Sequence, residues 1–144
     1  MKPAPGIAIE QQSEPALLRM CIWAEARGES VVGRLAVAWV LRNRALFRET
    51  SIKTEILRPW QFSSFNANDP NRGKMLTAWV DDPKGWVAVD VIAELFEQKA
   101  TIDPTKGASH YYVTAMADPP KWGRGHPLWE ETVEIGAHVF GKTA

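Results

Sequence analysis

Two glutamates four residues apart, Glu25 and Glu29, have the spacing and the surroundings for acid–base chemistry. They lie in CIWAEARGES, residues 21–30, which otherwise has the pattern of the end of a buried helix. Glu25 falls on or beside the apolar stripe of that helix. Burial raises the pKa of a carboxyl group, and a glutamate with a pKa near 6 is about 10% protonated at pH 7. Such a residue can protonate a leaving group, although the spacing alone fits a solvated helix end equally well.

Metal and nucleophilic chemistry have weaker support in the sequence. The histidines His110, His126 and His138 are 16 and 12 residues apart, which matches no short zinc-binding spacing. Cys21 lies on the apolar side of its helix and is expected to be a small buried residue. No serine has a G-x-S-x-G context, and no glycine-rich phosphate loop is present. We therefore expect no metal and no other cofactor.

The composition argues against several classes of partner. The chain has 144 residues, a formal net charge of zero and a single cysteine. This length suggests one domain. The chain lacks the excess of basic residues that is typical of nucleic-acid-binding proteins. The sequence contains no run of about 20 apolar residues, which a membrane-spanning helix would need. We expect a monomer that binds neither nucleic acid nor a membrane and has no internal disulfide.

The pattern of apolar and capping residues predicts helices first and a small sheet last. Residues 1–13 are expected to be a loose arm, followed by one catalytic domain over residues 14–144. Helices are expected from Ser13 to Gly28, 30–47, 51–57 and 82–98. Residues 109–113 and 132–140 are rich in strand formers and are expected to pair as two antiparallel strands. The predicted fold class is α+β and mainly helical, with a small antiparallel sheet near the C-terminus.

Five blocks of the sequence, taken in order, resemble the SleB-like cell-wall hydrolase family. The blocks are AEARGES (24–30), GRLAVAWVLRNR (33–44), WQFSSFNANDPNR (60–72), DPTKGASHYYV (103–113) and IGAHVF (135–140). This family includes spore-cortex lytic enzymes and phage or prophage endolysins. Its members cleave peptidoglycan, typically between N-acetylmuramic acid and N-acetylglucosamine. The resemblance implies that substrate and a lysozyme- or transglycosylase-like fold built around one glutamate.

The resemblance also implies roles for individual residues. Glu25 matches the first glutamate of the family's E-A-R-G-E motif and would be the catalytic acid. Glu29 matches the second glutamate and would support the same site. Gln61, Phe62 and Ser63 match the family's Q-F-S motif and would line the glycan cleft. In an extended segment Gln61 and Ser63 share one side and Phe62 faces the other, so Phe62 is expected in the core.

Aromatic residues are the remaining candidates for substrate binding. Tyr111 and Tyr112 match the family's G-A-x-x-[FY] segment and are neighbours in a predicted strand, so they point to opposite faces. We list Tyr112 as the tyrosine that orients Glu25, and Tyr111 and His110 as glycan contacts, although the sequence does not decide which tyrosine faces the cleft. Stacking on sugar rings is predicted for Trp60, Trp122 and Trp129.

The number of carboxylates decides between two mechanisms. A glycosidase that adds water usually needs two, and the candidate partners of Glu25 are Glu29, Asp69 and Asp118. The two aspartates lie in turn-like, proline-containing stretches and are expected to be structural. We therefore predict a lytic transglycosylase, in which Glu25 is both acid and base, over a muramidase. A zinc-dependent N-acetylmuramoyl-L-alanine amidase and a non-catalytic glycan-binding module are the alternatives.

The start of the sequence bears on where the protein acts. MKPAPGIAIEQQSE lacks the apolar core of a signal peptide, and no separate peptidoglycan-binding repeat follows. Both features are expected of a compact phage endolysin. Such a protein stays in the host cytoplasm until another protein opens the membrane, and then reaches the periplasm and cell wall. A prophage remnant or a tail-associated lysin would have the same features.

Overall fold

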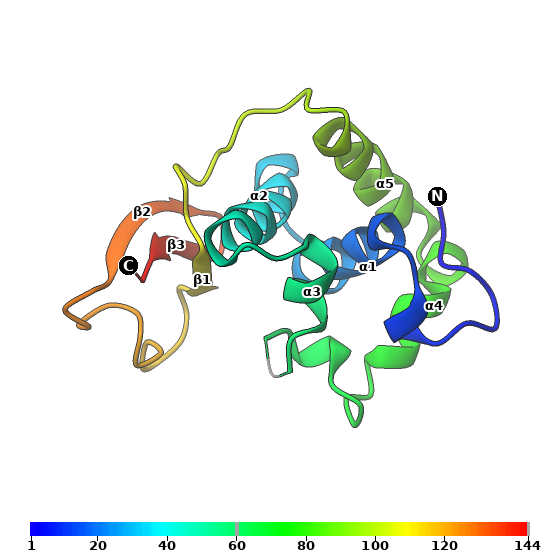
Figure 1. Cartoon of the computed structure of the whole chain (residues 1–144), viewed down its shortest axis with the longest axis horizontal. Coiled ribbons are helices and arrows are strands. Elements are labelled where there is room, and N and C mark those ends of the chain that lie inside the picture. The colour runs from blue at the N-terminus through cyan, green and yellow to red at the C-terminus, as the bar shows by residue number, and fades with distance from the viewer. Residues whose placement is uncertain (60, 144) are drawn as a thin grey trace.

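The computed structural model describes residues 1–59 and 61–143, which form a helical body and a small sheet beside it (Figure 1). The helices in the described residues are α1 (Glu14–Ala26), α2 (Val31–Arg48), α3 (Ile52–Leu57), α4 (Arg72–Asp81) and α5 (Pro83–Glu97). The strands are β1 (His110–Val113), β2 (Glu130–Ile135) and β3 (His138–Lys142). Among the described helices, none has the length and apolar character needed to cross a membrane. The predicted α+β class, mainly helical with a late sheet, is confirmed.

Capping residues fix where the helices begin. The Ser13 and Ser30 hydroxyls accept hydrogen bonds from backbone N–H groups three residues on, at 3.3 Å and 3.2 Å. Asp82 does the same for α5, with Pro83 in the first turn. A polar side chain at this position satisfies one of the N–H groups that a helix start leaves free. These three starts agree with the sequence-based prediction.

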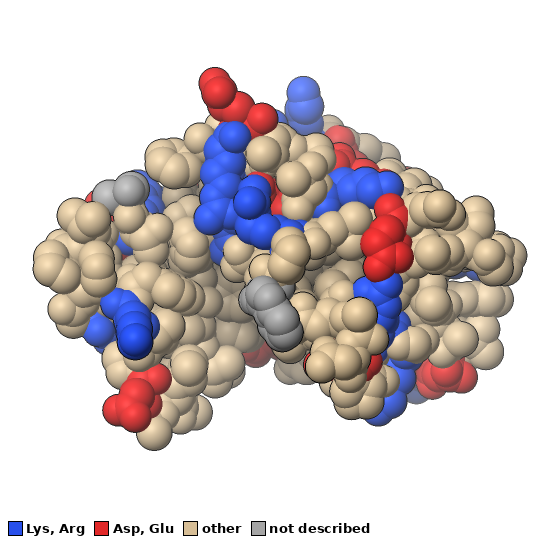
Figure 2. Space-filling view, turned by 60° about the horizontal axis from the view of Figure 1, so that its bottom comes forward, with Lys and Arg blue, Asp and Glu red and all other residues tan. Residues whose placement is uncertain are grey.

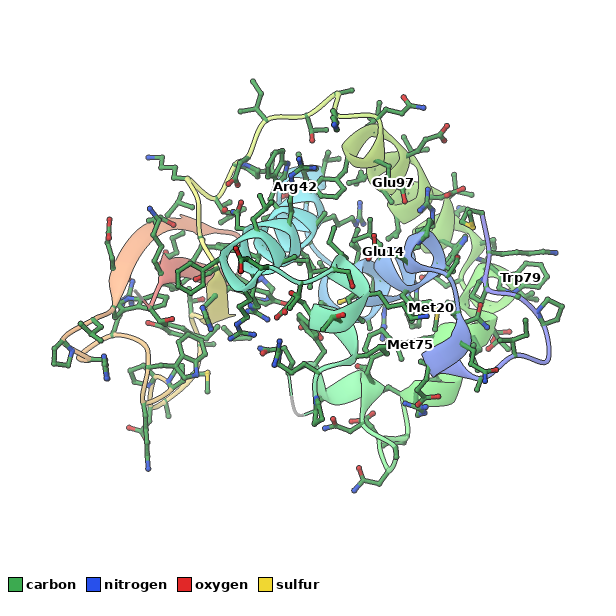
Figure 3. The ribbon with its side chains drawn as sticks, in the orientation of Figure 1. Glu14, Met20, Arg42, Met75, Trp79 and Glu97 are labelled. Carbon is green, nitrogen blue, oxygen red and sulfur yellow. The ribbon has the colours of Figure 1, made fainter. Side chains whose placement is uncertain are left out.

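Helix α1 runs through the middle of the helical body and is buried on most of its surface. Contacts with α2, α3, α4 and α5 surround it. Its residues Leu17, Leu18, Met20 and Ile22 are at most 2% exposed. Met75 of α4 belongs to the same core (Figure 3). Because α1 carries Glu25 in its last turn, the packing of four helices fixes the position of that carboxyl.

Residues 1–13 differ from the loose arm that was expected. Ile9 is 3% exposed and belongs to the main core. The buried Gln12 side chain holds Ala4 through its backbone N–H and C=O, at 2.8 Å and 2.9 Å. The Trp86 indole donates to the Met1 carbonyl at 2.9 Å. The segment is therefore ordered by its own side chains, which the proline and glycine content did not reveal.

The sheet has three strands where two were expected, in the order β1-β3-β2. The predicted strand 132–140 is a hairpin, because Gly136 has a φ of 54° and lets the chain reverse between Ile135 and His138. Strand β1 pairs with β3 alone, antiparallel, from His110↔Gly141 to Val113↔His138. Buried residues of α2, of β3 and of the loop before β1 form a second, smaller core that holds the sheet against the helices: Ala36, Val40, Ala108 and Phe140.

Candidate active site

A cavity of about 100 Å³ lies where the helical body meets the sheet. Its walls come from α1, α2, the loop after α3, β1 and the loop between β1 and β2. Figure 2 shows the surface notched at its lower edge, between the sheet at the left and the helical body. The residues that line the cavity are Glu25, Arg44, Gln61, Phe62, His110, Tyr111 and Trp122. Segments far apart in the sequence therefore meet around one carboxyl group.

Glu25 is half-buried and is held by one strong hydrogen bond. The Tyr111 hydroxyl donates to Glu25 Oε1 at 2.6 Å, across 86 residues of sequence. Burial raises the pKa of Glu25, while the hydrogen bond from Tyr111 and the neighbouring His138 oppose that rise. Burial and the nearby Glu25 raise the pKa of Tyr111 well above its usual value, so its phenol stays a donor. The geometry leaves Oε2 as the atom that can carry a transferable proton.

The two adjacent tyrosines have different environments, and the prediction that Tyr112 orients Glu25 differs from the structure. Tyr111 faces Glu25, whereas Tyr112 points to the other face of the sheet and packs against Trp122 and Trp129, with ring centroids 5.8 Å and 5.6 Å away. The buried Tyr112 hydroxyl has no hydrogen-bond partner among the described residues. The alternation of a strand explains why only one tyrosine reaches the cavity.

Glu29 lies outside the cavity and binds the β2–β3 turn. Its Oε1 accepts from the Ala137 backbone N–H at 3.1 Å and lies 2.9 Å from His138 Nδ1. The turn fits closely, because a Cβ on Gly136 would lie 2.8 Å from Glu29 Oε2. His138 in turn packs edge-on against Tyr111, with ring centroids 5.0 Å apart. Glu29 is therefore linked to Tyr111 indirectly, through His138.

Arg44 also lines the cavity, although the sequence did not mark it as a site residue. It is only 2% exposed, and its Nε donates to the Ser109 carbonyl at 2.9 Å. Its NH1 is buried without a hydrogen-bond partner among the described residues. Burial lowers the pKa of Arg44 to about 10, so the guanidinium is still charged at neutral pH. The signal in the sequence was an arginine on the inner, apolar face of its helix.

The predicted glycan contacts divide into two groups. Gln61, His110 and Trp122 line the cavity as expected, and the His110 and Trp122 rings lie 5.1 Å apart. Ser63 is exposed and does not line it, because residues 63–65 form a turn of 3-10 helix rather than the extended segment expected. Trp60 lies outside the described residues.

Trp129, the third tryptophan predicted to stack on sugar rings, does not line this cavity. It lies against Gly141, where a Cβ would overlap the indole ring. Phe62 is 4% exposed and lies in the core as predicted, while one edge reaches the cavity.

Within the described residues, Glu25 is the one carboxylate that lines the cavity. Asp69 accepts from the Asn71 backbone N–H at 2.8 Å, as a turn former does, and Asp118 is exposed. Across residues 1–59 and 61–143, no three His, Cys, Asp or Glu side chains come together as a metal site would require. The arrangement offers one protonatable carboxyl group, one phenol donor and one buried cation.

Comparison with known proteins supports the fold and identifies the family. The catalytic domain of the germination-specific lytic transglycosylase SleB from Bacillus anthracis has a similar fold, with a TM-score of 0.64 and 20% identity over 96% of this chain and 99% of that one. The catalytic domain of the Bacillus cereus SleB protein gives a TM-score of 0.59 and 22% identity, over 97% of this chain and 95% of that one. No curated protein matches the sequence. The family described as Cell Wall Hydrolase matches residues 28–141, from just after Glu25 to the end of β3. The chain belongs to this cell wall hydrolase family.

Proposed function

We propose that this protein cleaves the glycosidic bond between N-acetylmuramic acid and N-acetylglucosamine in peptidoglycan, as a lytic transglycosylase. The observation that carries the proposal is the environment of Glu25: a half-buried carboxyl group with a raised pKa, held by Tyr111 in a cavity. Membership of the cell wall hydrolase family supports the choice of substrate. The name of the B. anthracis neighbour, a lytic transglycosylase, supports the choice of reaction.

The first step needs a proton on the leaving oxygen. Glu25 donates it from Oε2 to the glycosidic oxygen as the bond to C1 of the muramic acid breaks, leaving an oxocarbenium-like sugar. Tyr111 donates to Oε1 throughout and stabilises the carboxylate that results. Arg44, which is still charged at neutral pH, lines the same cavity and places a positive charge beside the substrate site.

The second step returns the enzyme to its starting state. The Glu25 carboxylate removes the proton from the 6-hydroxyl of the same muramic acid, and that oxygen attacks C1. The product is a 1,6-anhydro sugar, and no water is consumed. A hydrolytic route would need a second carboxylate about 5–9.5 Å from the first, and the described lining of the cavity contains no other. This favours the transglycosylase over the muramidase.

The test is a digest of purified peptidoglycan by the wild type, Glu25→Gln and a control, Glu94→Gln, on exposed α5 surface away from the cavity. Soluble products are measured by mass spectrometry. We expect products one water lighter than reducing-end disaccharide-peptides, from the wild type and Glu94→Gln but not from Glu25→Gln. Reducing-end products would indicate a muramidase. Released stem peptides or a fully active Glu25→Gln would refute the proposal.

We also propose that the protein is an endolysin that waits in the host cytoplasm, as the sequence suggested. Its support is the family's action on cell walls, from which a cytoplasmic enzyme is separated by a membrane. Expression in the cytoplasm of a Gram-negative host should leave cells intact until a membrane-permeabilising agent is added. Lysis without permeabilisation, or no lysis with it, would contradict this role.

A further inference from the structure

A second cavity, of about 160 Å³, lies directly beside the first. Its walls come from the C-terminal end of α2, from residues 107–110 and from the end of β3. The side chain of His110 lines both cavities. Burial, Arg44 and Arg48 lower the pKa of His110 to about 4, so the shared wall is neutral at pH 7.

Two cationic side chains line the second cavity. Arg48 and Lys142 line it, and no described lining residue is an aspartate or a glutamate. Arg48 NH1 binds the buried Glu55 at 2.7 Å, which leaves its other two guanidinium nitrogens without a hydrogen bond to a described residue. The Lys142 ammonium has neither a hydrogen bond nor an ion pair with a described side chain.

The nearest loop carboxylate, Asp103, does not line the second cavity, and its oxygens are occupied by hydrogen bonds from neutral donors. Asp103 accepts hydrogen bonds from Thr105, Asn43 and the Gly107 backbone N–H, at 2.6–3.0 Å. It holds residues 103–108 in the shape that closes one side of the cavity. Gly107 has a φ of +84°, and a Cβ there would lie 3.3 Å from Lys142 Cε, so a side chain would crowd the ammonium. The backbone therefore keeps the space beside Lys142 open.

The other wall of the second cavity is apolar. Phe47 lines it and is 74% exposed, so its ring is available for contact with a ligand. Two cations opposite an aromatic ring suit a carboxylate carried on a short aliphatic chain, since the ring takes the methylenes and the cations take the oxygens.

We infer that this second cavity binds a free carboxylate of the peptide stem that hangs from the muramic acid. The inference rests on the proposed function, because it needs the muramic acid at Glu25. The stem leaves that sugar next to the bond to be cleaved, and the shared wall at His110 places the second cavity within reach of its first residues. The stem is acidic and flexible, and its carboxylates match the charge of Arg48 and Lys142. The enzyme therefore selects glycan strands that still carry peptides.

The experiment uses Glu25→Gln, which should bind without cleaving, and Lys142→Met in the same background, which keeps the aliphatic stem and removes the charge. Calorimetry measures the affinity for a peptide-bearing tetrasaccharide and for the same tetrasaccharide after the stems are removed. Lys74→Met, exposed on α4 and away from both cavities, is the matched control. Circular dichroism confirms that each variant is folded.

We expect Glu25→Gln to bind the peptide-bearing ligand about tenfold more tightly than the peptide-free one, as for one hydrogen-bonded charge pair. Lys142→Met should bring this ratio close to one, and Lys74→Met should leave it unchanged. Equal affinities for the two ligands, a ratio unchanged by Lys142→Met, or no binding at all would overturn the inference. Digestion of peptidoglycan by the wild type tests the proposed function separately, because cleavage does not depend on a preference for either ligand.

Discussion

The most informative single change is Tyr111→Phe. It removes the one hydroxyl that donates to Glu25, at 2.6 Å, and leaves the ring in place against His138 and Phe140, with centroids 5.0 Å and 5.4 Å away. The fold should therefore survive, while the carboxyl loses its fixed donor. No other described group donates to Glu25 and could take over this role.

The size and the direction of the effect follow from the contact. A hydrogen bond to a charged group contributes about 1.5–3 kcal/mol, and this bond strengthens as Glu25 becomes a carboxylate in the first step. Its loss should lower kcat/KM by about 10- to 100-fold. The bond also opposes the rise in the pKa of Glu25. Without it the pKa rises further, so the acid stays protonated to higher pH and the alkaline limb of the pH profile moves to higher pH.

The assay is release of soluble muropeptides across a pH series, with Tyr112→Phe as the matched control. Tyr112 is the next residue, and its buried hydroxyl has no partner among the described residues, so its loss should change activity by less than about twofold. Equal loss in both variants would show that the tyrosines act through packing alone. A shift of the alkaline limb to lower pH in Tyr111→Phe would refute the assigned direction of the hydrogen bond.

Three further changes test the electrostatics of the fold. Because burial raises the pKa of Glu25, ionising it costs stability as pH rises above the unfolded value, so Glu25→Gln should have a higher Tm than the wild type at pH 8 and an equal one at pH 4. Glu55 is 0% exposed, and although burial opposes ionisation, hydrogen bonds from Arg58, Thr50 and Arg48 lower its pKa to about 2. Ionised Glu55 therefore stabilises the folded state by at most about 3 kcal/mol, and this contribution should be lost between about pH 4.5 and pH 2. In urea unfolding, Glu55→Gln should lack this acid-dependent loss of stability. Glu29→Gln removes the charge that faces His138 and should cost about 1 kcal/mol; an unchanged urea midpoint would show that the contact is not needed.

Features that depend on local chemistry were predictable from the sequence. Ser13, Ser30 and Asp82 are caps with their acceptors in place, and the alternation of a strand already required the two tyrosines to diverge. Helix α4 could not be predicted because residues 58–73, which include its start, are rich in turn formers. In addition, the side chain of its N-cap residue, Asn71, makes no capping hydrogen bond. The second half of the sheet was read as one strand because Gly136 is a single residue in an otherwise continuous β pattern.

Features that depend on long-range contacts were not predictable. Which tyrosine faces Glu25 depends on how β1 is paired with β3 and packed on α2. The hydrogen bond between Glu29 and the Ala137 backbone N–H joins residues that are 108 positions apart in the sequence. Arg44 is a charged residue in an apolar stripe of the sequence, and only the fold shows that it lines the same cavity as Glu25.

The long reach of the contact between Tyr111 and Glu25 has a consequence for synthesis on the ribosome. The glutamate is made early, but β1 has its one pairing partner in β3, which ends at Lys142. A nascent chain that has only completed its helices holds the acid without its donor and without the far wall of the cavity. Catalytic competence should therefore appear abruptly, once β3 has left the exit tunnel, and chains that terminate before β3 should be inactive on purified peptidoglycan.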